Sequence, residues 1–405
     1  MAISPDEASL ALLEIFILLA VAHLFGSIVQ RLGLPRVVGE LLAGMVIGSY
    51  ALGGILNNAL GIPLFAINDF VLLFADFAVI LLIFGAGLEG GLAALRTAGS
   101  WAIAAAVAGD LVPFGVTFVI FSAFYPVSTA LLLGVAAAAT STAVVASFLQ
   151  SEGIGSTAPG RFLLTTAAID DVVALILLSV VLTLRGGTSD LLKISSGIAY
   201  TSIVWVVVLV VSVLVIPRVF RIRGVRESAD APLITLFLLV VAVGALGFSA
   251  LLGAFIAGLA IAESLAAPKA RENVEVLLLT FGALFFVVLG SQFNVSYLLQ
   301  PKVLALAAIL MGVASLGKVA GVLPFARGRF GPGPTARAIA VGLIPRGEIG
   351  LIVGAVGLSV GAFDQYLLGA ILVMSMLTTV LGALLFRELK GGLYTPAVPA
   401  STSPR

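Results

Sequence analysis

The chain has 405 residues, of which 61% are hydrophobic and only 10% are charged, and its mean hydropathy is +1.23. A soluble protein of average composition carries about 25% charged residues, so this composition excludes a single water-soluble core and predicts an integral membrane protein. The sequence has no cysteine and one histidine, which excludes disulfides, thiol nucleophiles and histidine-rich metal sites. A net charge of +1 gives no reason to expect a nucleic-acid partner.

Apolar runs of about 20 residues, long enough to cross a bilayer as helices, predict about thirteen transmembrane spans in an all-α fold. Gly, Pro and charged residues separate the runs, and the eighth and ninth spans divide near residues 247–253. The predicted spans are 8–30, 36–56, 69–89, 97–125, 127–150, 160–185, 195–217, 231–249, 250–265, 274–292, 302–326, 335–357 and 363–386.

Basic residues are distributed unequally between the two sets of alternating loops. One set carries most of the Lys and Arg residues, whereas the other carries only Arg185, Lys193 and Lys302. Because cytoplasmic loops are enriched in Lys and Arg, we expect the N-terminus outside and the C-terminus in the cytoplasm. The expected location is the cell (inner) membrane, which the chain crosses many times.

The second half of the chain partly repeats the pattern of the first. A shift of seven spans takes the fifth span to the twelfth and the sixth to the thirteenth, and each of these has a small or polar centre. An odd shift reverses the orientation in the membrane. The pattern therefore predicts two inverted six-helix repeats joined by one linker span, an arrangement found in many ion-coupled transporters.

Two adjacent carboxylates, Asp170 and Asp171, lie in the centre of the sixth span. Ionisable groups inside a span are costly and therefore mark candidate functional sites. Neighbours on a helix point about 100° apart, so one carboxylate can face a partner helix while the other faces a water-filled cavity. Lys318, in the eleventh span, is the expected ion-pair partner because a buried ammonium needs an anion. The alternative is a lysine that snorkels to the membrane interface.

The centres of the fifth and twelfth spans are polar. Thr140, Ser141 and Thr142 offer oxygen ligands for Na⁺, Li⁺ or K⁺, unless their hydroxyls bond back to the preceding helical turn. Pro and Gly in residues 342–350 interrupt the twelfth span, and the freed carbonyls can line an ion cavity. In that segment Arg346 and Glu348 pair with each other or hold the broken ends. Weaker candidates, with packing or interfacial roles expected, are Glu40, Glu89, Asp76, Asp110 and His23.

Six motifs occur in an order and spacing that extend over nearly the whole chain. They are Val37-Val38-Gly39-Glu40-Leu41-Leu42-Ala43-Gly44, Gly87-Leu88-Glu89, Thr140-Ser141-Thr142, Ile169-Asp170-Asp171, Gly317-Lys318-Val319 and Pro345-Arg346-Gly347-Glu348-Ile349-Gly350-Leu351-Ile352. In these motifs the chain resembles the NapA-type sodium/proton antiporters of the second monovalent cation:proton antiporter family. The resemblance implies a homodimer in which a six-helix core domain with two crossed, unwound helices moves against a dimerisation domain. The expected core is 97–185 and 302–386, and the expected dimerisation domain is 8–56 and 195–292.

The resemblance also implies roles for individual residues. Asp171 becomes the main carboxylate for cation and proton, Asp170 pairs with Lys318, and residues 140–142 lie at the first helix crossing. The Kef-type potassium relatives usually have Gln-Asp where this chain has Asp170-Asp171. They also carry a cytoplasmic nucleotide-binding domain, whereas this chain ends soon after its last predicted span. Both differences favour sodium over gated potassium efflux.

A membrane carboxylate binds a proton or a Na⁺ ion but not both well, and this competition is what ion exchange requires. The sequence therefore predicts an antiporter that exchanges cytoplasmic Na⁺ or Li⁺ for external protons without a cofactor, in pH homeostasis. The resemblance implies that the exchange uses an elevator-type movement. A second proton on Lys318 would make the exchange electrogenic. The alternatives are a K⁺/H⁺ antiporter, an ion channel and a sodium-coupled solute symporter. An intramembrane aspartyl protease is disfavoured, because its two carboxylates must face each other, so we expect no enzyme.

Overall fold

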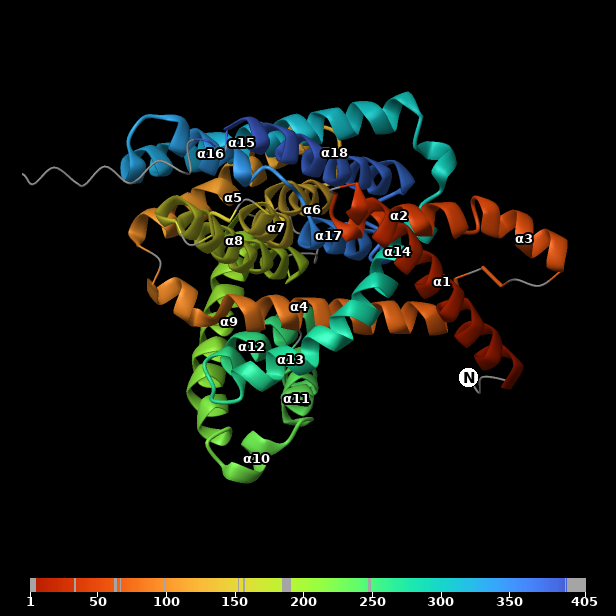
Figure 1. Cartoon of the computed structure of the whole chain (residues 1–405), viewed down its shortest axis with the longest axis horizontal. Coiled ribbons are helices and arrows are strands. Elements are labelled where there is room, and N and C mark those ends of the chain that lie inside the picture. Colours follow the sequence, from red (N-terminus) through yellow and green to blue (C-terminus); the bar gives the residue numbers. More distant parts are fainter. Residues whose placement is uncertain are drawn as a thin grey trace, which may run out of the picture. The chain divides into compact units, whose positions relative to one another are not determined.

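The computed structural model describes residues 5–32, 34–61, 64–65, 67–97, 99–151, 153–155, 157–183, 191–246, 249–389 and 391, and its regular elements there are helices (Figure 1). Eight of the described helices are long and apolar enough to cross a membrane, and shorter apolar helices of 10–17 residues accompany them. The predicted all-α membrane class is thus confirmed. Each predicted span coincides with helix, but residues 247–248, where the eighth and ninth spans were divided, lie outside the described residues.

The helices group into two compact units. The first unit is Met1–Leu92, Leu182–Ala305 and Phe363–Gly369, and the second is Ala93–Val181, Leu306–Ala362 and Ala370–Arg405. Each unit therefore draws on both halves of the chain. The assignment of core and dimerisation roles remains a prediction.

The first unit is built from helices that pack through small residues. Contacts join α1 to α2, α2 to α14, and α12 to both α9 and α11. At the α2–α14 contact, Gly44 and Gly290 each lie against the other helix's backbone, where a side chain would collide. Such close approach is usual between membrane helices. The elements are α1 (Pro5–Arg31), α2 (Arg36–Ile47), α3 (Leu52–Leu60), α4 (Asp69–Thr97), α9 (Leu191–Val219), α10 (Arg223–Glu227), α11 (Ala231–Ala245), α12 (Ala250–Ala262), α13 (Ala267–Leu277), the π-helical turn η2 (Leu278–Gly282), α14 (Ala283–Gln292) and the 3-10 turn η3 (Val295–Tyr297).

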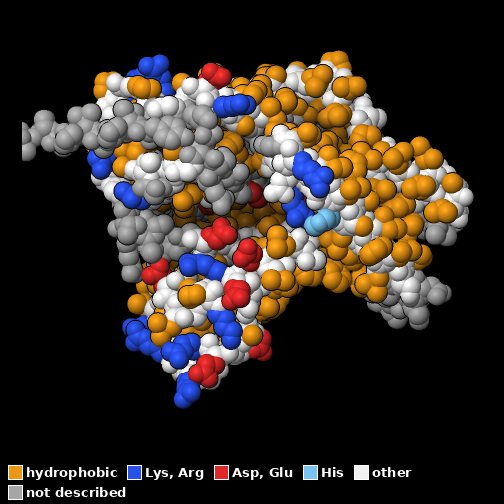
Figure 2. Space-filling model, viewed as in Figure 1, with side chains coloured by type: hydrophobic (Ala, Val, Ile, Leu, Met, Phe, Trp, Pro, Cys, Tyr) orange, Lys and Arg blue, Asp and Glu red, His pale blue; other side chains and the backbone are white. Residues whose placement is uncertain are grey.

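The surface of the first unit has the distribution of side chains expected in a bilayer. Large apolar side chains remain exposed, among them Phe16 on α1 (67%) and Val241 on α11 (69%). Figure 2 shows hydrophobic side chains over α1 to α3 and charged side chains gathered around α10. At α10, Arg223 and Glu227 form an exposed ion pair of 3.0 Å. Exposed apolar helices facing lipid, with charges at a short connecting helix, fit a protein that spans the membrane.

The second unit contains two helices that are broken in the middle. Residues 139–141 separate α6 (Val127–Ala138) from α7 (Thr142–Ser151), and residues 343–347 separate α16 (Pro334–Gly342) from α17 (Glu348–Ser359). The second break contains Pro345, which has no N–H to donate and restricts the residue before it. Helices α6 and α17 are in contact (Figure 1). The unit also contains α5 (Ser100–Ser122), α8 (Ala158–Thr183) and the larger parts of α15 (Pro301–Phe330) and α18 (Gln365–Leu389).

Candidate functional site

The two helix breaks of the second unit are joined directly to each other. The backbone N–H of Ser141 donates to the carbonyl of Pro345 at 2.9 Å, and the Thr140 hydroxyl donates to the carbonyl of Leu343 at 3.2 Å. Gly347 lies so close to Ser141 that any side chain at position 347 would collide with it. The hydroxyl of Thr140 thus binds the opposite segment rather than its own helix.

Lys318 is buried between two carboxylates. Its Nζ contacts Oδ1 of Asp170 on α8 and, at 2.6 Å, Oδ1 of Asp110 on α5. All three side chains have a relative exposure of 0%. The second oxygen of Asp170 accepts the backbone N–H of Thr140 at 2.9 Å, which ties the ion pair to the first helix break. Lys318 is therefore a buried counter-ion and does not snorkel to an interface.

Glycines bring α5 and α15 together at this ion pair. A side chain at Gly317 would collide with Pro113, and one at Gly321 would collide with the backbone of Ala108. This close contact places Lys318 opposite Asp110. The sequence placed Asp110 among the weaker candidates, with a packing or interfacial role expected. Its position near the middle of α5 (Ser100–Ser122) was the available signal that it faces a buried partner.

Asp171 has a different environment from its neighbour. Whereas Asp170 is fully buried, Asp171 is half-buried, and its Oδ2 accepts a hydrogen bond of 2.8 Å from the Thr142 hydroxyl. The angular offset between successive helical residues accounts for this difference. Carboxylate and hydroxyl oxygens are hard ligands, the type that hard cations prefer. Asp171 and Thr142 can therefore bind either a proton or a small cation.

Arg346 is a fully buried cation that binds backbone carbonyls. Its Nη1 donates to the carbonyls of Ala138 (2.7 Å) and Ala139 (3.1 Å), and its Nη2 donates to that of Ala314 on α15 (2.6 Å). Carbonyls at the C-terminus of a helix carry partial negative charge, so the guanidinium stabilises the end of α6. Two of the carbonyls freed by the break are thus already occupied.

Glu348 has a separate partner in the same region. Its Oε2 accepts a hydrogen bond of 3.1 Å from the Ser141 hydroxyl. The sequence left open whether Arg346 and Glu348 pair with each other or hold the broken ends. The structure gives each residue its own contact with the first break, which is the second of these two arrangements.

Hydroxyl groups of α18 hold the second break in place. The carbonyl of Arg346 accepts hydrogen bonds of 3.1 Å from Ser375 and from Thr379, and its backbone N–H donates to the Thr378 hydroxyl at 3.1 Å. The sequence identified only a polar centre in this span. These hydrogen bonds satisfy backbone groups that a broken helix leaves without partners inside a membrane.

The formal charges of the buried cluster cancel. Asp110 and Asp170 are acidic, Lys318 and Arg346 are basic, and all four are fully buried. Asp171 and Glu348 are half-buried beside them. The site therefore holds Asp171 in a partly accessible position next to an internally balanced set of charges.

Two of the weaker candidates in the first unit, Glu40 and His23, contact the same arginine. Arg36 on α2 donates from Nε to Glu40 Oε1 at 2.8 Å, and its Nη2 lies 2.8 Å from Nδ1 of His23 on α1. These contacts connect α1 with α2 and are consistent with the packing role that the sequence suggested for Glu40 and His23.

Two broken helices whose breaks meet at buried charges are typical of secondary transporters. Residues 17–389 match the family described as "Sodium/hydrogen exchanger, transmembrane". The chain belongs to this family.

Bacterial relatives agree with this assignment, and a solved archaeal structure shares the fold. The chain is 29% identical to the high-affinity Na⁺/H⁺ antiporter NhaS3 of Synechocystis, covering 99% of this chain and 94% of NhaS3. It is 28% identical to the Na⁺/H⁺-K⁺ antiporter GerN of Bacillus cereus, covering 91% of this chain and 93% of GerN. The sodium proton antiporter MjNhaP1 of Methanocaldococcus jannaschii has a similar fold, with a TM-score of 0.69, 16% identity and coverage of 96% of this chain and 100% of MjNhaP1.

Proposed function

We propose that the protein is a secondary active antiporter that exchanges Na⁺ or Li⁺ for H⁺ across the cell membrane. The observation that carries this proposal is the half-buried Asp171, bound by Thr142, beside the buried cluster of Asp110, Lys318 and Asp170. Membership of the sodium/hydrogen exchanger family supports the same reaction. The exchanged ions are the substrates, and the driving force is an ion gradient.

Exchange follows from competition at one carboxylate. Asp171 binds a proton on one side of the membrane and releases it when a Na⁺ ion takes its place on the other. The Thr142 hydroxyl, 2.8 Å from the carboxylate, can turn its oxygen toward a bound cation. Removing the negative charge of Asp171 abolishes both halves of the cycle.

The ion pair beside Asp171 supplies a second proton. A cation bound by Asp171 also attracts Asp170, the adjacent residue on α8, and draws it away from Lys318. Lys318 then keeps only Asp110 as its counter-ion, so its charged form loses one of its two stabilising contacts. We therefore propose an electrogenic cycle in which Asp110 determines how tightly Lys318 keeps its proton.

Access to the site alternates by an elevator movement, in which the second compact unit carries the bound ion. We also propose a homodimer, with the N-terminus outside and the C-terminus in the cytoplasm, so that Na⁺ leaves the cell and protons enter. The resemblance to NapA-type antiporters supports the movement and the dimer, and the distribution of Lys and Arg supports the orientation. Since the chain has no cysteine, single cysteines introduced into each unit can carry spin labels without background. Their separation should change when Na⁺ replaces H⁺.

A K⁺/H⁺ antiporter is the second candidate. One relative, GerN, is named as a Na⁺/H⁺-K⁺ antiporter, and oxygen ligands accept either cation. The Asp170-Asp171 pair supports Na⁺ as the main substrate.

Purified protein in liposomes loaded with a pH dye tests the reaction and its selectivity together. Addition of Na⁺ or Li⁺ should move protons in the opposite direction, and K⁺ at the same concentration should have a smaller effect. Cation flux without proton counterflow would contradict exchange and indicate a channel. A response to K⁺ as large as that to Na⁺ would favour the second candidate.

A further inference from the structure

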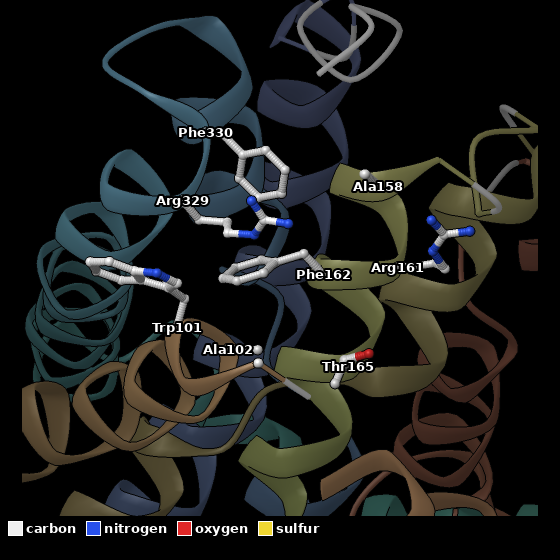
Figure 3. A pocket seen from close by; sticks show the side chains of 9 residues that line it. Trp101, Ala102, Ala158, Arg161, Phe162, Thr165, Arg329 and Phe330 are labelled. Carbon is white, nitrogen blue, oxygen red and sulfur yellow. The ribbon is translucent and has the colours of Figure 1, made fainter. Parts of the chain in front are cut away.

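A cavity of about 470 Å³ opens in the second unit between the ends of three helices, and none of the ion-site residues lines it. It lies between the start of α5, the start of α8 and the end of α15 (Figure 3). Its walls include the aromatic side chains of Trp101, Phe162 and Phe330, and it also contains Thr165, Arg161 and Arg329. None of the described residues that line it is acidic.

The cavity lies at the level of the lipid head groups. Helices α5, α8 and α15 are long enough to cross the membrane. The apolar segment of α5 begins at Ser100, that of α8 begins at Ala158, and that of α15 ends at Phe330. These three ends therefore mark a membrane–water boundary. Trp and Arg side chains are enriched at such boundaries, where one end of the side chain is in apolar surroundings and the other is in water.

The aromatic walls are fixed by the protein itself. The rings of Phe162 and Phe330 meet edge to face at 5.3 Å. Trp101 packs beside Phe325 at 6.4 Å and covers Gly328, where any side chain would collide with the indole ring. The cavity is therefore preformed and does not depend on a ligand for its shape.

The charge in the cavity is positive. The side chains of Arg161 and Arg329 are exposed, and the Arg329 guanidinium lies 5.5 Å from the centre of the Phe330 ring. Helix α8, 26 residues long, begins at the cavity wall and adds the partial positive charge of its N-terminus. Guanidinium and hydroxyl groups are suited to bind phosphate oxygens, and Figure 3 shows Arg329 and Arg161 apart from each other, on α15 and α8.

We propose that this cavity binds the phosphate head group of an anionic phospholipid. The depth in the membrane and the aromatic walls favour a lipid over a free anion, which would gain nothing from apolar contacts. Leu164, one turn after Arg161 on α8, is 38% exposed and offers apolar surface for an acyl chain. A basic pocket between transmembrane helices is a known type of site for anionic head groups. A lipid held here contacts three helices of the same unit and stabilises them together.

The test compares lipids and variants in the purified full-length protein. The melting temperature is measured in neutral detergent with added phosphatidylglycerol, cardiolipin or phosphatidylcholine, and retained lipid is counted by native mass spectrometry. The site variant is Arg161→Gln with Arg329→Gln. The control is Arg327→Gln, which removes an exposed arginine of the same helix that does not line the cavity.

The native protein and the control should gain thermal stability from the anionic lipids but not from phosphatidylcholine. The site variant should lose about half of that gain or more and should retain fewer anionic lipids. An equal gain in melting temperature in the site variant would show that the cavity does not bind the lipid. If inorganic phosphate alone stabilises the native protein and this effect is lost in the site variant, the ligand is a soluble anion and the proposal of a bound lipid is wrong. Arg329→Gln by itself replaces the pair if the double variant does not fold, and an unchanged gain would again overturn the site.

Discussion

Lys318 and Asp110 form a buried ion pair between α15 and α5, with 2.6 Å between Nζ and Oδ1. The same ammonium also contacts Asp170, so one lysine is shared by two carboxylates from different helices. Removing one member of a buried pair typically costs about 3–5 kcal/mol, because the other charge is left without a partner. In this cluster the stability that is lost depends on which of the three residues is replaced.

We predict that Lys318→Gln destabilises the protein more than either Asp170→Asn or Asp110→Asn. Loss of the lysine leaves two buried carboxylates without a counter-ion, whereas loss of one aspartate leaves Lys318 paired with the other. Melting temperatures of the three purified variants check this order. Asp170→Asn combined with Lys318→Gln should recover part of the temperature lost by the lysine variant. Strictly additive losses would show that the two residues are not energetically coupled.

Asp110→Asn should shift the pH dependence of exchange toward lower pH. Without this carboxylate, the Lys318 ammonium has no anionic partner once a cation attracts Asp170, and a buried charge without a partner is unfavourable. The pH of half-maximal Na⁺-driven proton flux in liposomes measures the shift. Asp230→Asn, an exposed aspartate in the loop before α11, is the control and should leave the profile in place. A profile of Asp110→Asn identical to that of the control would contradict the proposed role of Asp110.

The membrane potential should change the rate and the equilibrium of exchange. When more than one proton moves for each Na⁺, net charge crosses the membrane, and each elementary charge is worth about 2.3 kcal/mol per 100 mV. Na⁺-driven proton flux in liposomes clamped at several potassium–valinomycin potentials measures this dependence. Flux that is indifferent to voltage would show electroneutral exchange, with Lys318 acting only as a structural counter-ion.

Gly347→Ala should prevent the two helix breaks from meeting. The added methyl group would collide with Ser141, and overpacking a buried contact costs about 1–3 kcal/mol. Exchange should fall sharply, and the melting temperature should decrease. Gly333→Ala is the matched control, because nothing lies within 4 Å of the added group at that position. Comparable losses in both variants would show that the Ser141 contact is not the cause.

The sequence was sufficient for features that depend on local composition. Apolar runs located the helices, and Pro345 with its flanking glycines located the second break. The first break has no proline or glycine in residues 139–141, so its polar centre was the only signal. Hydrogen bonds and packing from other segments hold that break open.

The parts of the site that could not be predicted from the sequence depend on contacts between distant segments. Asp110 meets Lys318 only because α5 packs against α15, and no pattern within α5 specifies that contact. Arg346 was recognised as a candidate, but three of its acceptors are backbone carbonyls, which leave no mark in the sequence.

The central claim is that Asp171 binds the proton and the cation in turn. Asp171→Asn keeps the size of the side chain but removes the charge that both ions need. The most direct measurement is Na⁺-driven proton flux through this variant in liposomes, alongside the native protein and Asp230→Asn at equal incorporation, with the melting temperature recorded to establish folding. We expect a folded Asp171→Asn protein with no flux above that of empty liposomes and an Asp230→Asn protein with native flux. Near-native flux through Asp171→Asn would contradict the account.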